Sequence, residues 1–255
     1  MTDAEWRDCC EPGRMLSCLR GKASDRKLRL FGCACCRRVW HFLTDESYRR
    51  AVEAAEGYAD RPKGRRKLAG VHAAACGALQ DAWGPAYPAW AAACLVTKAP
   101  LRDAPRGVAE NTAEAAARGA AEAAYREAEA NPQEGDAAAR AEAAARDARA
   151  RAVTAECQAQ ALLLHDIFGP LPFRPLPPVA PPLLSWNNAL VPRLARSAYD
   201  ERHLPSGHLD AQRIAVLADA LEDAGCQDDE LLQHLREPGP HVRGCFVIDL
   251  LLNRA

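Results

Sequence analysis

LADALEDAGCQDDELLQHLREPGPHVRGCFVIDLLL, residues 217–252, is the stretch that decides the predicted fold. At its start, four apolar residues recur at intervals of three and four, the spacing of one helix face: Ile214, Leu217, Ala218 and Leu221. Gly225 follows where a helix often ends in a left-handed residue. The pattern therefore predicts an amphipathic helix that ends near Gly225.

Two more short helices are expected after this one. Negative charge at 228–230 favours a helix N-terminus, and Pro238-Gly239 should end that second helix. Pro240 suits the first turn of a third helix, because its missing N–H would have no partner there in any case. From Val242 to Leu252 the sequence is apolar nearly all round, so the third helix is expected to be buried.

Asp249 is the exception in that apolar run. A buried carboxylate needs a partner, so we expect an ion pair with Arg243 or with an arginine from another helix. A catalytic or binding role for this acid is the alternative interpretation.

The composition indicates helices that pack through small side chains. Alanine accounts for much of the 49% hydrophobic content of the 255 residues, and aromatic residues contribute only 6%. The net charge of −1 combines a net charge of +6 over residues 1–70 with −7 over the remainder. A basic head on an acidic body can attract nucleic acid, but the charges of the head are interleaved, so we expect pairing within the molecule.

The N-terminus and the cysteines indicate a reducing compartment. The start MTDAEWRD is acidic and lacks the apolar region of a signal peptide, and no apolar run reaches the length of a membrane span. The chain has 11 cysteines, an odd number, without the even spacing of a disulfide framework. We therefore expect reduced thiols and a cytoplasmic location.

An alanine-rich helical hairpin is predicted over residues 107–168. This segment is nearly all Ala, Glu and Arg as far as residue 161, with a single break at 131–135. High helix propensity and small side chains let two such helices approach closely. We expect the hairpin to lie on the rest of the protein, because it lacks the Leu and Ile that drive coiled-coil association; a partner-binding arm is the alternative.

A proline-rich strap is predicted over residues 169–186. Seven prolines exclude a regular helix through most of it: Pro170, Pro172, Pro175, Pro177, Pro178, Pro181 and Pro182. Apolar residues between them favour an extended strap laid across the helices. The PxxP matches Pro172–Pro175 and Pro175–Pro178 leave a ligand for a proline-recognition domain as the alternative.

The predicted fold is therefore all-α, a multi-helix bundle of nine to eleven helices. An N-terminal helical body, residues 1–168, includes the hairpin of residues 107–168. The strap, residues 169–186, connects this body to a C-terminal module of three to four helices, residues 187–255.

Several motifs together resemble a large family of paralogous planctomycete proteins. The motifs are MTDAEWRDCCEP, LRGKASDRKLRLF, ACCRRVWHFL, HDIFG, FRP, AYDER, LADALEDAGC and GPHVRGCFVIDLLL. The resemblance covers nearly the whole chain and implies an all-α fold. Because the family is functionally uncharacterised, the resemblance implies no activity, cofactor or catalytic residue. The chain departs from the family pattern within GCACC and at Leu235, where the family pattern has a cysteine.

A zinc site is the sharpest chemical prediction. The candidate ligands, spaced C-x7-H-x6-H-x3-C, are Cys226, His234, His241 and Cys245. Two cysteines and two histidines are a typical tetrahedral zinc set, and His241 and Cys245 would face the same way on a helix. The spacing matches no standard zinc pattern, so ordinary core packing of the cysteines is the alternative.

Other chemical signals are weaker. Cys33, Cys36 and His41 form a second candidate metal set, but one continuous helix would separate Cys33 from His41 by roughly 12 Å. The sequence has no GxSxG, HExxH or GxGxxG, and RGKAS at Arg20 lacks the earlier glycine and the strand of a P-loop. Cys245 and His241 as nucleophile and base have no evident third group, so the sequence favours a protein without catalytic activity.

The predicted function is a non-catalytic protein-interaction or scaffold module with an unknown protein partner, recognisable by an exposed apolar patch beside the strap. A zinc-stabilised helical module is one alternative. A nucleic-acid-binding protein is the other. Its candidate contacts are Arg14, Arg20, Lys22, Arg26, Lys27, Arg37 and Arg38, with the loop Lys63–Lys67.

Overall fold

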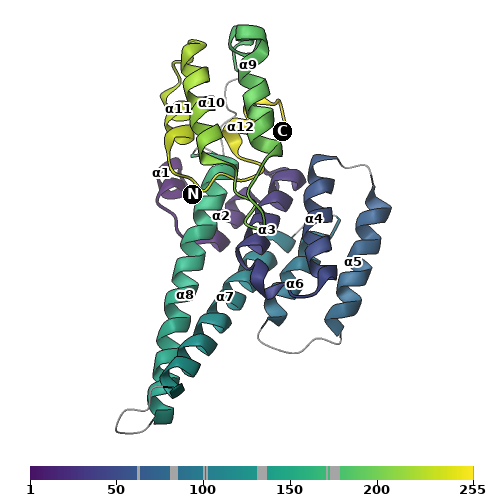
Figure 1. The fold of residues 1–255 in the computed structure, drawn as a ribbon, viewed down its shortest axis with the longest axis vertical. Helices are drawn as coiled ribbons and strands as arrows, with labels where there is room; N and C mark the ends of the chain where they lie inside the picture. Colours follow the sequence, from purple (N-terminus) through teal and green to yellow (C-terminus); the bar gives the residue numbers. More distant parts are fainter. Residues whose placement is uncertain are drawn as a thin grey trace.

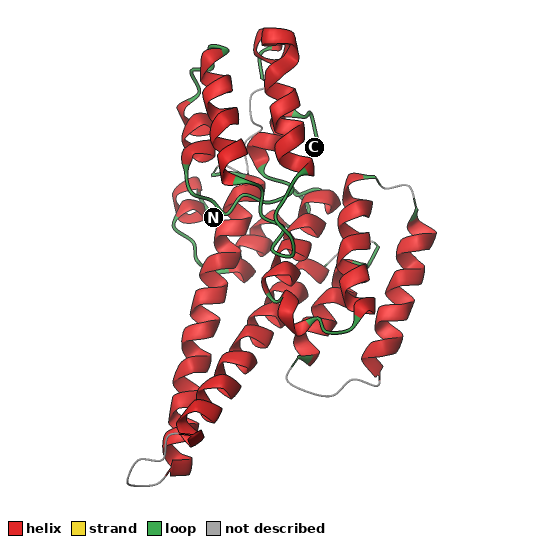
Figure 2. Ribbon diagram, viewed as in Figure 1, coloured by secondary structure: helices red, strands yellow, loops and turns green. Residues whose placement is uncertain are grey.

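The computed structural model describes residues 1–61, 64–80, 86–99, 101, 103–130, 137–170, 172 and 179–254. Within these residues it contains twelve α-helices and one 3-10 helix, and the only β-structure is two isolated bridges (Figures 1 and 2). The predicted all-α helical bundle is thus confirmed. None of the described helices has both the length and the apolar character that crossing a membrane requires.

One helix more than expected is present, the short α1 at the N-terminus. Its capping box stabilises it: Glu5 N donates to the Thr2 hydroxyl at 3.2 Å, and Thr2 N donates to the Glu5 carboxylate at 2.7 Å. The N-terminal body has α1 (Asp3–Arg7), α2 (Pro12–Leu19), α3 (Asp25–Arg38), η1 (Trp40–Phe42), α4 (Glu46–Asp60), α5 (Arg65–Gln80), α6 (Tyr87–Val96), α7 (Ala104–Ala130) and α8 (Ala137–Phe168).

Helix α3 is the centre of this body. Ser24 is its N-cap residue, whose hydroxyl accepts from Lys27 N, and residues 29–37 are all buried. The helix packs against α4, α6, α7 and α8. A Cβ on Gly32 would come within 2.9 Å of Val96, so glycine lets α6 approach α3 closely here. The first core cluster forms around this face.

The hairpin of α7 and α8 lies on the body over half of its length only. The buried residues of α7 fall between Ala104 and Ala117, and those of α8 from Glu156 onward contact the body, while beyond them the two helices pack on each other. Figure 1 shows this far half projecting from the other helices. The expectation that the hairpin lies on the rest of the protein is therefore wrong for the far half. There the described parts of the two helices pack only on each other, through small side chains.

Seven of the 18 residues of the predicted strap, residues 171 and 173–178, lie outside the described residues, and they carry much of both PxxP matches. At the end of the strap, Pro181 and Pro182 form the first turn of α9 (Pro181–Asp200). The prediction that prolines exclude a helix through residue 182 is wrong, because a first-turn proline loses no helical hydrogen bond. A left-handed turn with positive φ at Asn187, Asn188 and Ala189 interrupts α9.

A loop over residues 201–210 follows α9 and leads to α10 (Ala211–Asp223), α11 (Asp229–Arg236) and α12 (Phe246–Leu251). Together with α9 these helices enclose a second core cluster. Helix α10 is followed by Gly225 at φ +93°, and α11 ends before Pro238, both as predicted. The third helix does not begin at Pro240, because Gly239 and Gly244, at φ +86° and +97°, hold this segment as a loop. His241 and Cys245 are therefore not on one helix.

Replacing Gly119 with alanine should destabilise the protein, although alanine is the better helix former. A Cβ at this position of α7 would overlap the ring of Phe42, so we expect a loss of about 1–3 kcal/mol in the free energy of unfolding. Gly70 of α5 has nothing within 4 Å of its Cβ position, so Gly70→Ala should stabilise by up to about 1 kcal/mol. Urea denaturation of both variants tests this, and equal stabilisation by the two would contradict it.

Candidate metal centre

Four side chains meet where the C-terminal helices pack on α8. They are Asp166 of α8, His234 of α11, and His241 and Cys245 of the loop before α12. One ligand atom from each lies within 4.8 Å of the other three. The structure thus brings together three of the four predicted ligands, with a carboxylate in place of Cys226.

Local structure explains how each of these side chains reaches the site. Asp166 lies on the apolar face of α8 beside Ile167 and is itself 2% exposed. His234 lies in the last turn of α11. A Cβ on Gly239 would come within 2.7 Å of His241 N, so glycine is required where the loop turns toward the site. Cys245 is the N-cap residue of α12 and is completely buried.

The distances are those of a nearly assembled tetrahedral site. Asp166 Oδ1 lies 3.1 Å from His234 Nε2 and 3.1 Å from His241 Nδ1, and Cys245 Sγ lies 3.3 Å from His234 Nε2. Bonds of 2.0–2.3 Å from zinc to O, N and S imply ligand separations of about 3.3–3.8 Å. Small side-chain movements therefore suffice to place a zinc ion between the four atoms.

The contacts of His241 favour a positive charge at the centre of the site, either on its ring or on a metal ion. His241 Nε2 lies 3.1 Å from Glu237 O, and because a carbonyl oxygen only accepts, this nitrogen carries a proton. In a neutral His241 ring, Nδ1 is then a bare acceptor that faces the Asp166 carboxylate. Two acceptors that face each other repel. A second proton on the ring, or a metal ion between the two atoms, makes the contact favourable. A zinc-binding histidine commonly donates its other N–H to a carbonyl, as His241 does.

The pKa directions describe the same centre without metal. Burial alone would lower the pKa of His241, but the hydrogen bonds and charges of Asp166 and Glu237 together outweigh this and raise the pKa. Burial alone would raise the pKa of Asp166, but the hydrogen bonds from His234 and His241 lower it. Burial raises the pKa of the Cys245 thiol, so metal binding at this position releases a proton.

The same geometry does not support nucleophilic catalysis. In a relay of nucleophile, base and acid, the imidazole uses one ring nitrogen for the nucleophile and the other for the acid. Here Cys245 and Asp166 both contact the same nitrogen, Nε2 of His234. Cys245 is also completely buried, so a substrate has no access to its sulfur.

Cys226 is a correction to the predicted ligand set. It is buried in the second core cluster and does not belong to the four-residue group. Helix α11 separates it from the site, because Cys226 precedes Asp229 and the rise from Asp229 to His234 is roughly 8 Å along the axis. Cys226 therefore packs as a small apolar side chain.

The structure also locates the second candidate metal set and Asp249. Cys33 and Cys36 are buried in α3, whereas His41 lies exposed in η1 after the helix has ended, and the only possible metal-binding group among the described residues is the one at Asp166. Asp249 does pair with an arginine of another helix: Arg26 of α3 contacts it with both terminal nitrogens, Nη2 at 3.0 Å from Oδ1.

The basic residues proposed for nucleic acid mostly bind acceptors within the protein. The contacts are Arg14–Glu11, Arg20–Asp103, Arg26–Asp249, Lys27–Ile167 O, Arg37–Glu56 and Arg38–Glu156. Lys22 is exposed. Lys63 of the second basic loop lies outside the described residues, and Arg65, Arg66 and Lys67 are exposed. Pairing within the molecule thus dilutes the positive field that a phosphate backbone requires.

Comparisons with protein-family models, with curated proteins and with solved structures find no match to this chain. The resemblance to planctomycete proteins stays a prediction.

Proposed function

We propose that this protein is a zinc-stabilised, non-catalytic helical module. The observation that supports this is the convergence of Asp166, His234, His241 and Cys245, whose ligand atoms lie within 4.8 Å of one another. Zinc suits a mixed set of sulfur, nitrogen and oxygen ligands. Four protein ligands complete its tetrahedral shell, which is typical of structural sites and leaves no open position for a substrate.

The proposed role of the ion is to fasten the C-terminal helices to α8. Asp166 belongs to the N-terminal body, whereas the other three ligands follow α10 in the chain. Zinc binding at all four therefore stabilises only the docked arrangement. A cavity of about 460 Å³, lined by His234 together with His165 and Phe246, provides a route of entry for the ion.

Cobalt substitution tests the proposed ligands. One equivalent of Co²⁺ added to the metal-free full chain should give the visible absorption of a tetrahedral site together with a thiolate-to-cobalt charge-transfer band. Cys245→Ser should lose the charge-transfer band, whereas Cys226→Ser should keep it. The absence of both bands from the wild-type protein would contradict the proposal.

A second proposal concerns the partner. We infer that the protein is an interaction module that binds another protein through the projecting half of the α7–α8 hairpin, where Tyr125 is exposed and charged residues of both signs alternate. A cytoplasmic location belongs to this proposal, and the 11 free cysteines support it, because reduced thiols persist in that compartment.

Shortening the hairpin tests this second proposal. The Arg149–Glu114 ion pair fixes the register of the two helices, so replacing residues 123–140 with a glycine-rich turn keeps that register. The shortened chain should retain its helical circular dichroism and its metal. A partner captured by the full chain should be lost, whereas capture of the same partner by both forms would contradict the role of the hairpin.

A further inference from the structure

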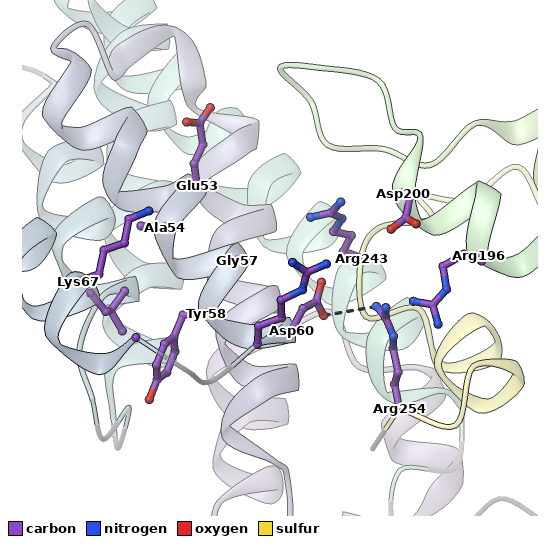
Figure 3. Close-up of a pocket in the computed structure, with 13 residues that line it drawn as sticks. Glu53, Ala54, Gly57, Tyr58, Asp60, Lys67, Arg196, Asp200, Arg243 and Arg254 are labelled. Carbon is purple, nitrogen blue, oxygen red and sulfur yellow. Dashed lines mark ion pairs between the residues drawn. The ribbon is translucent and has the colours of Figure 1, made fainter.

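A second cavity, also of about 460 Å³, lies where α4 and α5 meet α9 and the C-terminal segment (Figure 3). Its cationic lining residues are Arg61, Lys67, Arg196, Arg243 and Arg254. Its acidic lining residues are Glu53, Asp60 and Asp200. Tyr58 and Leu68 add apolar surface to one wall. None of these residues belongs to the metal centre.

The inner end of this cavity is electrically neutral. Arg26 lies behind it, with Nη2 at 3.1 Å from Asp60 Oδ1 and 3.0 Å from Asp249 Oδ1. Arg254 Nη1 lies 3.5 Å from the same oxygen of Asp60, and the Tyr199 hydroxyl donates to that oxygen at 2.6 Å. Two arginines thus balance two carboxylates there.

The rest of the lining carries an excess of positive charge. Beyond the inner network, four cations face two carboxylates, Glu53 and Asp200, a net charge of +2. Within the described part of the chain, none of these four cations forms an ion pair: Arg61, Lys67, Arg196 and Arg243. The cavity therefore has a charge that its own side chains leave unbalanced.

Tyr199 orients two of the arginines in advance. Arg243 Nε donates to Tyr199 O at 3.3 Å, and its guanidinium lies 5.2 Å from the Tyr199 ring. The Arg254 guanidinium lies 4.1 Å from the same ring, and its buried Nη1 has the 3.5 Å ion-pair contact with Asp60 but forms no hydrogen bond among the described residues. Figure 3 shows the guanidinium groups of Arg196 and Arg254 pointing toward one another, although their charges repel. An anion between them would relieve this repulsion.

We propose that this cavity binds a small phosphomonoester. The planar guanidinium forks of Arg196, Arg243 and Arg254 match the oxygens of a phosphate group, whose charge of nearly −2 balances the excess. The cavity extends to Tyr58 on its opposite side, and Leu68 also lines it, which leaves room for the remainder of the ligand. The volume falls in the range of small-molecule sites.

Titration of the full chain with inorganic phosphate, at constant ionic strength set with sodium chloride, tests the proposal. Phosphate should bind saturably and raise the melting temperature, since its site joins the two halves of the fold. Arg243→Gln and Arg196→Gln should each weaken binding by about tenfold. Arg193→Gln, an exposed residue of the same helix that does not line the cavity, should bind as the wild type does.

Two results of this titration would overturn the proposal. One is that phosphate has no saturable effect, and the other is that Arg193→Gln weakens phosphate binding as much as Arg196→Gln does. Because the Arg196 side chain is exposed and unpaired, its variant should fold even if Arg243→Gln does not. Phenyl phosphate should bind more tightly than inorganic phosphate, because its ring buries apolar surface in the cavity. Equal affinities would assign the cavity to free phosphate, and tighter binding of polyglutamate would assign it to an acidic polypeptide.

Discussion

Replacing His241 with alanine should destabilise the protein by about 3–5 kcal/mol and abolish its response to metal. The reason is that His241, together with His234, balances the buried Asp166 carboxylate, and it is also a proposed ligand. Adding a strong zinc chelator to the wild-type protein should lower its melting temperature toward that of the variant, since only the docked arrangement holds all four ligands. Thermal denaturation with and without chelator measures both effects.

His203→Ala provides the matched control. His203 precedes the same helices and contacts Asp210, but its side chain is 64% exposed and it lies outside the metal-binding group. This variant should lose less than about 1 kcal/mol and should respond to the chelator as the wild type does. A wild-type melting temperature that the chelator leaves unchanged would contradict the claim that a bound metal ion stabilises the fold.

Replacing Glu56 with glutamine should have the second large effect, again about 3–5 kcal/mol at neutral pH. Glu56 of α4 is 3% exposed, and its carboxylate accepts from Arg37 Nη2 at 2.8 Å and from Arg202 Nη2 at 2.6 Å. In the wild type, the negative charge of Glu56 compensates two largely buried guanidinium groups and thereby joins α3 and α4 to the loop after α9. The substitution removes this charge. Urea denaturation of wild type and variant measures the loss.

The loss should depend on pH with a defined sign. Burial alone would raise the pKa of Glu56, but the hydrogen bonds and charges of Arg37 and Arg202 together outweigh it, so its folded-state pKa lies below the ordinary value of 4.5. A depressed pKa stabilises the folded state above the unfolded-state value, and this stability is lost as the pH falls through the folded-state value. The difference between wild type and Glu56→Gln should therefore be full above about pH 5 and shrink at lower pH.

Glu46→Gln is the control for this second prediction. Glu46 lies on the same helix and pairs with Arg50, but both side chains are more than half exposed. Its replacement should lower the free energy of unfolding by less than about 1 kcal/mol, because solvent screens an exposed ion pair. The favourable position of the negative charge near the helix N-terminus adds little to this. A Glu56→Gln variant that loses no more stability than Glu46→Gln would show that the buried network is not a stabilising contact.

Local sequence patterns predicted the helices well where backbone chemistry determines the ends. Gly225 and Pro238 end two helices as expected, because one takes a left-handed conformation and the other cannot continue a helix. The prolines near helix starts were predicted wrongly in two ways: a helix was missed at one and expected at another. Pro181 begins α9, whereas Pro240 begins no helix, since proline is compatible with a first turn without requiring one.

The site was only partly predictable because tertiary packing assembles it. His234, His241 and Cys245 are close in sequence, so their spacing indicated a metal centre. Asp166 was missed because it precedes His234 by 68 residues. One signal for it existed: a carboxylate on the apolar end of α8, next to Ile167, has to find a partner once the helix is buried. The phosphate cavity gave no such signal, since its arginines come from separate segments of the chain.

Zinc content tests the central claim most directly. The protein should be purified without an affinity tag from zinc-containing medium and measured by elemental analysis alongside two variants. The wild type and Cys226→Ala should each carry about one zinc per chain, whereas the double variant His241→Ala, Cys245→Ala should carry essentially none. A wild-type protein without zinc, or a double variant that retains it, would contradict a metal centre at Asp166, His234, His241 and Cys245.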